Sequence, residues 1–259
     1  MARVLSALAI LPLVVGTIWF LPPLATLVLA EVVVLLAFRE YAALAAGYGA
    51  SLSPGVTVVA VAAVAAAVAL DVTVVVLMVS GLTIGIVSLA SVRRGTQTLL
   101  DSAASVFPIL YLGLPIGAAV AVRTTGGREA VLLLLATIAV SDTAQYYGGR
   151  WLGKTPLAPA ISPKKTVEGA LFGLIAGIAV MTLAVTPVLD QSPVPQRALL
   201  GIAIVGLGIA GDLFESQLKR GAGVKDASAL IPGHGGVLDR IDSLLFAAPG
   251  FYLFLQLGA

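Results

Sequence analysis

The stretch "VTVVAVAAVAAAVAL", residues 56–70, is built almost entirely from valine and alanine and carries no charged side chain. Valine favours β-strands, so a strand has to be considered beside a helix. The strands of a membrane barrel alternate apolar and polar residues, and this stretch does not alternate. A helix satisfies its own backbone hydrogen bonds inside a bilayer, so we expect a membrane-spanning helix here.

Similar apolar runs recur along the whole chain of 259 residues. Hydrophobic residues make up 59% of it and charged residues 11%, and its mean hydropathy is +1.07. Soluble domains carry about a quarter charged residues, so the composition predicts an all-α polytopic membrane protein. Cysteine is absent, which excludes disulfides and thiolate metal sites.

Nine segments have the apolar character of transmembrane helices. They are predicted at about 4–21, 23–38, 56–70, 72–90, 105–122, 129–147, 168–188, 198–218 and 241–257. Proline and glycine mark most of the joins between them. The first run follows Arg3 as in a signal peptide, but its length favours a retained helix.

Positive charges orient these helices. With nine crossings, only Arg123, Arg128 and Arg197 fall on the side opposite the N-terminus, and the other twelve of the fifteen Lys and Arg residues fall on the N-terminal side. The positive-inside rule then predicts a cytoplasmic N-terminus in the cell (inner) membrane. The net charge of +2 therefore reflects topology, and no nucleic-acid partner is expected.

Acidic residues are distributed unevenly along the chain. Residues 1–100 contain three of them, Glu31, Glu40 and Asp71, whereas residues 142–242 contain eight. We therefore expect residues 1–100 to be a transmembrane scaffold and residues 101–259 to be the catalytic region, with a polar cavity on its cytoplasmic side.

Polar side chains share helix faces in that second region. The i, i+3, i+4, i+7 spacing in "GDLFESQLKR", residues 211–220, places four of them on one face: Asp212, Glu215, Ser216 and Lys219. Asp239 and Asp242 are similarly spaced at the start of the last helix, and Asp142 lies in the sixth. Ionisable groups at membrane depth normally face a bundle interior or a water-filled cavity. A simple intramembrane ion pair is the alternative interpretation.

Carboxylates gathered from several helices would repel one another without a cation. An oxygen-rich set favours Mg²⁺, and a second cation stays open. The lone histidine, His234, cannot form a zinc site without further ligands. The cytoplasmic loops at 148–170 and 221–236 are rich in glycine and in basic residues, which suit phosphate groups. Together these features predict a site for a phosphorylated substrate and a nucleotide.

From Ser216 to Asp242 the chain reads "SQLKRGAGVKDASALIPGHGGVLDRID", which resembles the signature of CDP-diacylglycerol synthases, also called phosphatidate cytidylyltransferases. The positions that match the family's spacing are Ser216, Lys219, Arg220, Lys225, Asp226, Pro232, His234, Gly235, Gly236, Asp239, Arg240 and Asp242. Upstream, "SPKKTVEG" at 162–169 and the aspartate of "SDTAQYYGGR" at 141–150 also resemble family elements. Gln145 and Val167 depart from the family pattern.

The resemblance implies a Mg²⁺-dependent enzyme that converts CTP and phosphatidate to CDP-diacylglycerol and pyrophosphate at the membrane, as a homodimer. It implies metal ligation by Asp212 and Asp239, with Asp142 and Asp242 as further candidates. The catalytic group expected from it is Ser216, Lys219, Asp226 and His234, of which Ser216 and His234 order the site. The residues expected to bind the substrates are Lys164, Lys165, Arg220, Lys225, Gly235, Gly236 and Arg240.

Other functions stay open at this point. Buried carboxylates also mark ion pathways, so a transporter is an alternative, although the chain shows no convincing internal repeat. A related enzyme acting on an isoprenoid phosphate or an ether lipid is a second alternative. A purely structural membrane protein is a third.

Overall fold

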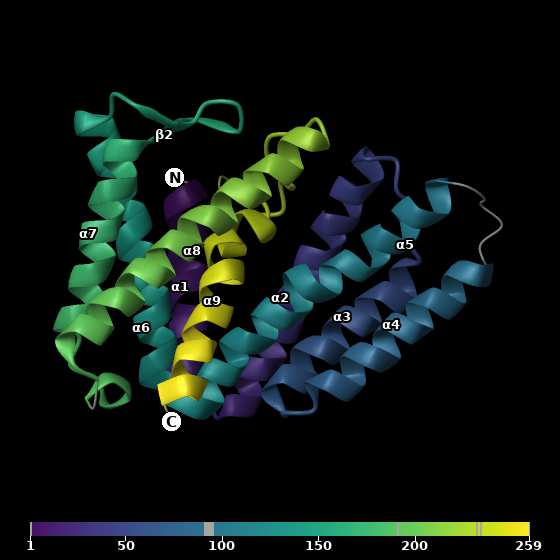
Figure 1. The fold of residues 1–259 in the computed structure, drawn as a ribbon, viewed down its shortest axis with the longest axis horizontal. Helices are drawn as coiled ribbons and strands as arrows, with labels where there is room; N and C mark the ends of the chain where they lie inside the picture. Colours follow the sequence, from purple (N-terminus) through teal and green to yellow (C-terminus); the bar gives the residue numbers. More distant parts are fainter. Residues whose placement is uncertain (1, 91–95, 191, 232, 234, 259) are drawn as a thin grey trace. The chain divides into compact units, whose positions relative to one another are not determined.

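Helices account for most of the protein in the computed structural model, which describes residues 2–90, 96–190, 192–231, 233 and 235–258 (Figure 1). In chain order the elements are α1 (Ala2–Phe20), α2 (Pro23–Gly47), α3 (Pro54–Ala69), α4 (Thr73–Ala90), α5 (Thr96–Pro108), the π-helical turn η1 (Ile109–Gly113), α6 (Leu114–Leu152), β1 (Pro156–Ala158), β2 (Ser162–Thr166), α7 (Val167–Leu183), the 3-10 turn η2 (Pro187–Leu189), α8 (Val194–Gly221) and α9 (Leu238–Gly258).

Each of the nine predicted apolar segments is largely helical in the described residues, but 105–122 runs over α5, η1 and the start of α6, and 168–188 extends beyond the end of α7 at Leu183. The predicted break between 105–122 and 129–147 lies within α6 at Gly127, whose φ of 78° and ψ of −177° are not helical. By length and composition, two of the described helical segments could cross a membrane, Gln97–Leu152 and Val194–Gly221. The helical positions are therefore confirmed, whereas the nine crossings stay a prediction.

The chain forms two compact units. Unit 1 contains Met1–Ala121 and Leu218–Arg240, and unit 2 contains Val122–Gln217 and Ile241–Ala259. The boundaries of the two units reflect how closely the residues pack within each of them. The predicted division at residue 100 concerns functional roles and stays a prediction.

In unit 1, α3 packs against α2, α4 and η1. Gly113 and Gly117, one helical turn apart, face the α3 backbone. A Cβ at Gly117 would lie 2.6 Å from the carbonyl oxygen of Ala65. Small residues at this spacing let two membrane helices approach closely, and they bring the fully buried Val61 and Val64 into the interior of unit 1.

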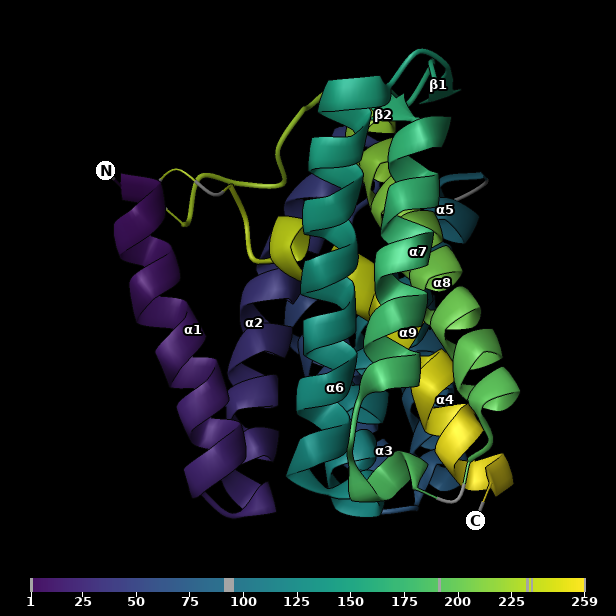
Figure 2. The same ribbon diagram turned by 90° about the vertical axis from the view of Figure 1, so that its left-hand side faces the viewer.

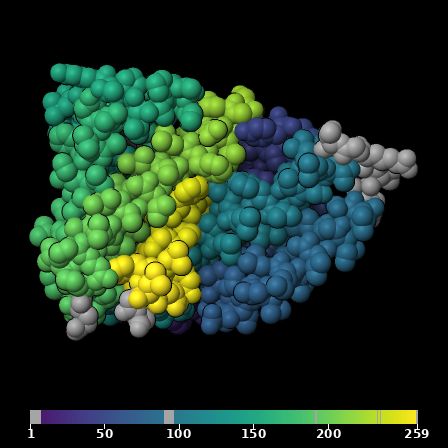
Figure 3. Space-filling model, in the orientation of Figure 1, coloured from purple at the N-terminus to yellow at the C-terminus, as the bar shows by residue number. Residues whose placement is uncertain are grey.

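The outer face of α4 is apolar and exposed. Val74, Val75, Met78 and Leu82 are each 65% to 68% exposed, and the helix lies at the surface of its unit in the space-filling view, in blue (Figure 3). A soluble domain seldom exposes a continuous apolar band, because burial of apolar surface stabilises the folded state. This face is typical of contact with lipid.

In unit 2, α6 and α7 run side by side (Figure 2). Gly173 and Gly177 of α7 are buried. A Cβ at Gly173 would overlap the side chain of Gln145, and one at Gly177 would overlap Val205. The first contact brings α7 close to the part of α6 that carries Asp142, and the second brings it close to α8.

The segment between α6 and α7, predicted as a loop, contains a short antiparallel hairpin instead. Pro156 pairs with Thr166 and Ala158 with Ser162. The all-α prediction therefore needs this correction. Pro156, Pro159 and Pro163 explain it, because proline restricts its own φ and pushes the preceding residue to extended conformations. Thr166 caps the start of α7, because its side chain accepts a hydrogen bond from the Gly169 N–H at 3.1 Å.

Candidate active site

The first polar cluster lies in unit 2, around Asp212 near the end of α8. Strand β2 brings Lys165 to it, and the Lys165 Nζ lies 2.5 Å from the Asp212 Oδ2. The next residue back along the strand, Lys164, is exposed. The two adjacent lysines, both expected to bind the substrates, therefore differ in environment.

Two further carboxylates belong to this Asp212 cluster. Asp242 of α9 lies within electrostatic range of Asp212, Asp142 and Lys165. A Cβ at Gly211 would overlap the Asp242 carbonyl oxygen, so α8 and α9 approach closely through this glycine. Gly211 thus places the first turns of α9 beside the last turns of α8.

Side-chain amides and hydroxyls complete the Asp212 cluster. The Gln145 Nε2 donates to the Asp142 Oδ1 at 3.1 Å and to the Ser141 Oγ at 3.2 Å. The Ser216 Oγ lies 3.4 Å from the Asp212 Oδ1, which is a long hydrogen bond. Ser216 therefore contacts Asp212, and its predicted role in ordering the site stays a prediction.

The second polar cluster lies in unit 1, around Asp239 at the start of α9. Its Oδ1 lies 2.5 Å from the Lys219 Nζ, and the two side chains are only 7% and 10% exposed. Its Oδ2 accepts hydrogen bonds from the backbone N–H of Gly236 at 2.7 Å and of Ala227 at 3.1 Å. This Asp239 cluster joins the end of α8 to the signature loop, the segment 222–237 between α8 and α9.

The Asp239 carboxylate is held in its ionised form. Burial opposes ionisation, but the hydrogen bonds from Lys219 and Gly236, the Lys219 charge and the Ala227 N–H together lower the pKa of Asp239 below its ordinary value. Asp239 precedes the predicted span 241–257. Gly235 is also adapted to this carboxylate, because its φ is +80° and a Cβ there would lie 2.8 Å from the Asp239 Oδ2.

Glu40 is the residue of this region that the sequence analysis missed. It lies on α2, in the predicted scaffold, and is 3% exposed. Its carboxylate accepts hydrogen bonds from the Ser228 Oγ and from the backbone N–H of Val237 and Leu238. A charged residue inside an apolar helix is the signal that could have revealed it, since such residues are costly unless they are paired. Glu40, Ser228, Val237 and Leu238 together are called the Glu40 cradle below.

The remaining predicted residues lie on the surface of the signature loop and beside it. Lys225, Asp226 and Arg240 are exposed. The exposed Arg220 donates from Nη1 to the Val224 carbonyl oxygen at 3.2 Å. His234 and Pro232 lie outside the described residues, so the role predicted for His234 stays a prediction.

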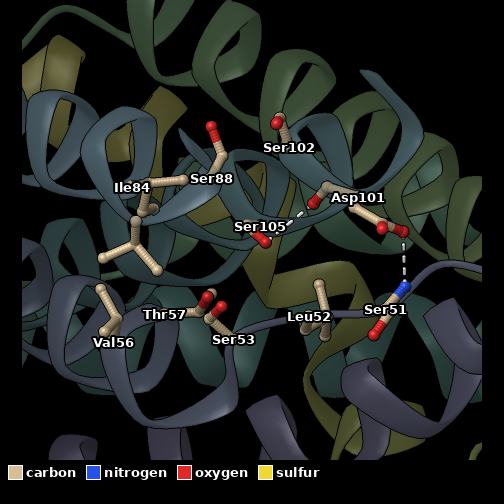
Figure 4. Close-up of a pocket in the computed structure, with 11 residues that line it drawn as sticks. Ser51, Leu52, Ser53, Val56, Thr57, Ile84, Ser88, Asp101, Ser102 and Ser105 are labelled. Atoms are coloured by element: carbon tan, nitrogen blue, oxygen red, sulfur yellow. Dashed lines mark hydrogen bonds between the residues drawn. The ribbon is translucent and has the colours of Figure 1, made fainter. Parts of the chain in front are cut away.

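A polar pocket of about 340 Å³ in unit 1 is separate from all the predicted site residues (Figure 4). Its walls carry hydroxyl side chains, among them Thr57 and Ser105, and one carboxylate, Asp101, which accepts a hydrogen bond from the Ser51 N–H at 2.7 Å. None of the described residues that line it is basic. Its chemistry does not suit a phosphate group.

The donor atoms of the Asp212 cluster fit Mg²⁺ in kind, because its carboxylate, amide and hydroxyl oxygens are the ligands that this ion prefers. In the described parts of the chain, no three acidic or histidine side chains converge closely enough to form a metal site as they stand. Lysine Nζ atoms lie against both Asp212 and Asp239 instead. The kinds of donor atom therefore suit Mg²⁺, although three acidic side chains do not converge on one point in the described residues.

Ionisable groups inside an apolar helical protein are costly and normally mark a functional site. Residues 1–258 match the model of the cytidylyltransferase family, and the chain belongs to that family.

Several curated proteins are similar to this chain over about half its length. A phosphatidate cytidylyltransferase of Helicobacter pylori is 38% identical over 151 residues, covering 58% of this chain and 56% of that protein. One of Synechocystis is 46% identical over 131 residues, covering 51% and 44%. The Escherichia coli protein YnbB, which is named as uncharacterized, is 44% identical over 131 residues with the same coverage. The chain thus spans about half the length of the curated relatives it matches.

Proposed function

We propose that this protein transfers the cytidylyl group of CTP to phosphatidate, giving CDP-diacylglycerol and pyrophosphate. The observation that carries the proposal is the match to the cytidylyltransferase family over residues 1–258, together with relatives named phosphatidate cytidylyltransferase. The two carboxylate–lysine clusters support it, because they contain Ser216, Lys219, Asp239 and Asp242, which the signature singles out.

The reaction is a single displacement at phosphorus. An oxygen of the phosphatidate phosphomonoester attacks the α-phosphorus of CTP, the bond from that phosphorus to the bridging oxygen breaks, and pyrophosphate leaves with the electron pair. The attacking oxygen comes from the lipid, so no protein nucleophile is required. Catalysis of such a step rests on alignment of the two substrates and on neutralisation of phosphate charge.

Basic residues supply part of that neutralisation. Lys165 is oriented by Asp212, and Lys219 by Asp239, at 2.5 Å in each case. A lysine held by a carboxylate presents its remaining N–H donors in a defined direction. The exposed Lys164, Arg220, Lys225 and Arg240 bind phosphate oxygens of CTP or of the lipid, and the Gly235–Gly236 backbone allows their close approach.

Mg²⁺ belongs to the same proposal. Asp212, Asp242 and Asp142 would hold one ion, and Asp239 is a further carboxylate ligand that could serve a second. A bound Mg²⁺ would screen the charge that develops on the attacking and leaving oxygens. Gln145 and Ser216 orient Asp142 and Asp212, and Asp226 and His234 order the signature loop.

The setting proposed for this chemistry is the cytoplasmic side of the cell (inner) membrane. Nine crossings would place the basic loops there, where CTP is dissolved, while the exposed apolar face of α4 contacts lipid. We propose a multi-pass enzyme that acts as a homodimer.

The test is incubation of the purified protein in lipid nanodiscs with α-labelled CTP, phosphatidate and Mg²⁺. The expected result is a labelled, lipid-soluble product with equal release of pyrophosphate. Product with an isoprenoid phosphate but not with phosphatidate would assign a different lipid. Absence of product with either acceptor, together with ion flux in vesicles, would replace the enzyme by a transporter.

A further inference from the structure

The signature loop is held at both ends by a helix of the predicted scaffold, α2. From this arrangement we propose that Glu40 is a positioning residue for the reaction: its carboxylate fixes the start of α9 and, through it, the orientation of Asp239. That Glu40 matters for the reaction rests on the proposed function. That Glu40 fixes the start of α9 rests on the geometry alone.

The contacts of Glu40 are unusually complete. Its Oε1 accepts from the Ser228 Oγ at 2.6 Å and the Val237 N–H at 2.9 Å, and its Oε2 accepts from the Leu238 N–H at 2.7 Å. The first N–H groups of a helix have no partner within the helix, and a negative charge beside them is favourable. Glu40, more than 180 residues earlier in the chain, therefore caps α9 from outside.

The Glu40 cradle and the Asp239 cluster share one stretch of backbone. Of three consecutive N–H groups, that of Gly236 binds Asp239, and those of Val237 and Leu238 bind Glu40. Movement of Glu40 would move the same peptide units that hold the Asp239 carboxylate. Gly236 has no space for a side chain, because a Cβ there would lie 2.5 Å from the Glu40 Oε2.

The other end of the signature loop is held by the last turn of α2 and its C-cap. The Tyr48 Oη donates to the Leu218 carbonyl oxygen at 2.9 Å, in the turn of α8 that carries Lys219. A Cβ at Gly47 would lie 3.0 Å from the Ala222 Cβ, so these two segments pack closely. Since α2 contacts the chain before and after the loop, it sets the distance between the loop ends.

The decisive variant is Glu40→Gln, which keeps the shape of the side chain. Its NH₂ group must face either the Leu238 N–H or the pair of donors at Oε1, so at least one hydrogen bond is lost, together with the negative charge. Glu40→Asp keeps the charge on a shorter side chain. Glu31→Gln is the matched control, because it removes a carboxylate nine residues earlier on the same helix.

Two measurements on the full-length protein in nanodiscs test the inference. Hydrogen–deuterium exchange should rise about tenfold or more in peptides that cover 227–238 of Glu40→Gln, since a hydrogen bond to a charged group is lost, and should be unchanged in Glu31→Gln. The kcat/KM for CTP should fall by about 10–100-fold, the usual effect of losing a residue that orients a ligand, and Glu40→Asp should retain more activity than Glu40→Gln.

Unchanged exchange at 227–238 in Glu40→Gln would overturn the inference. So would an increase spread equally over all helices of unit 1, which would indicate a general structural role. The two proposals fail separately: absence of CDP-diacylglycerol formation by the wild-type protein refutes the proposed function, whereas the exchange comparison still decides whether Glu40 positions the loop.

Discussion

Ion pairs of different burial offer a quantitative test of the site, and we predict that their coupling energies follow the order of burial. The three pairs, with the exposed fractions of the two side chains, are Lys219–Asp239 (10% and 7%), Lys165–Asp212 (23% and 29%) and Arg128–Glu129 (45% and 33%). The first two have the same N–O distance, 2.5 Å. Burial, rather than distance, must therefore separate them.

The expected magnitudes follow from solvent screening. Breaking a buried pair costs about 3–5 kcal/mol, because the remaining charge is left without its partner. Asp239→Asn keeps an oxygen for the Gly236 and Ala227 N–H groups. We therefore expect this substitution to lower the free energy of unfolding by about 3 kcal/mol, the lower end of that range. The partly exposed Lys165–Asp212 pair should couple by about 1 kcal/mol. Arg128–Glu129 should show no measurable coupling.

Double-mutant cycles measure these energies. For the buried pair the variants are Asp239→Asn, Lys219→Met and the double substitution, unfolded by heat in detergent micelles at constant lipid content. The double variant should be more stable than the sum of the single losses predicts. Additive losses for Lys219–Asp239, or a larger coupling for Lys165–Asp212, would refute the assignment of the Asp239 cluster as a buried pair.

The lowered pKa of Asp239 adds a pH dependence to the same cycle. A carboxyl group whose pKa is lower in the folded state contributes stability above its unfolded pKa of about 4, and this stability is lost as the pH falls through the folded value. The difference in unfolding midpoint between the wild type and Asp239→Asn should therefore be constant from about pH 7 to 5 and shrink below about pH 4. A difference that stays undiminished as the pH falls from 5 to 3 would contradict this.

Two further predictions concern turnover and the signature loop. Asp212→Asn should lower cytidylyl transfer by about 10²–10³-fold while leaving membrane insertion unchanged, as measured by labelled product per mole of extracted protein; turnover like that of the wild type would remove Asp212 from the site. Gly236→Ala should push the loop away from Glu40 and cost about 1–3 kcal/mol, whereas Gly206→Ala, at a helical position with open space, should not lower the stability in the same thermal assay.

Much of the helical arrangement could be predicted from the sequence. Apolar runs such as 56–70 have one good solution in a bilayer, and each predicted segment is largely helical in the described residues. The break near "TTGG" was also predictable, since glycine tolerates the positive φ found at Gly127. The hairpin at 156–166 was not predicted, because three prolines mark extended backbone without indicating which strands pair.

Part of the candidate site was predictable for the same local reasons. Helical spacing places Asp212 and Ser216 on one face of α8, and the structure shows the contact between them. The spacing of residues along one helix does not indicate which residues of other helices or strands they contact. The pairing of Lys165 with Asp212, rather than of Lys164, depends on the direction of β2.

By itself, the sequence determined the class of protein, the positions of the helices and the signature that marks the family, because hydrophobicity, helical periodicity and motif spacing are local properties of the chain. Only the tertiary structure decided which carboxylate meets which donor. Glu40 lies in a segment whose sequence looks like plain scaffold, yet it binds the backbone N–H groups at the start of α9. A hydrogen bond from a backbone N–H group to a side chain almost 200 positions away produces no periodic pattern in the sequence. Such contacts can therefore be identified only in the folded structure.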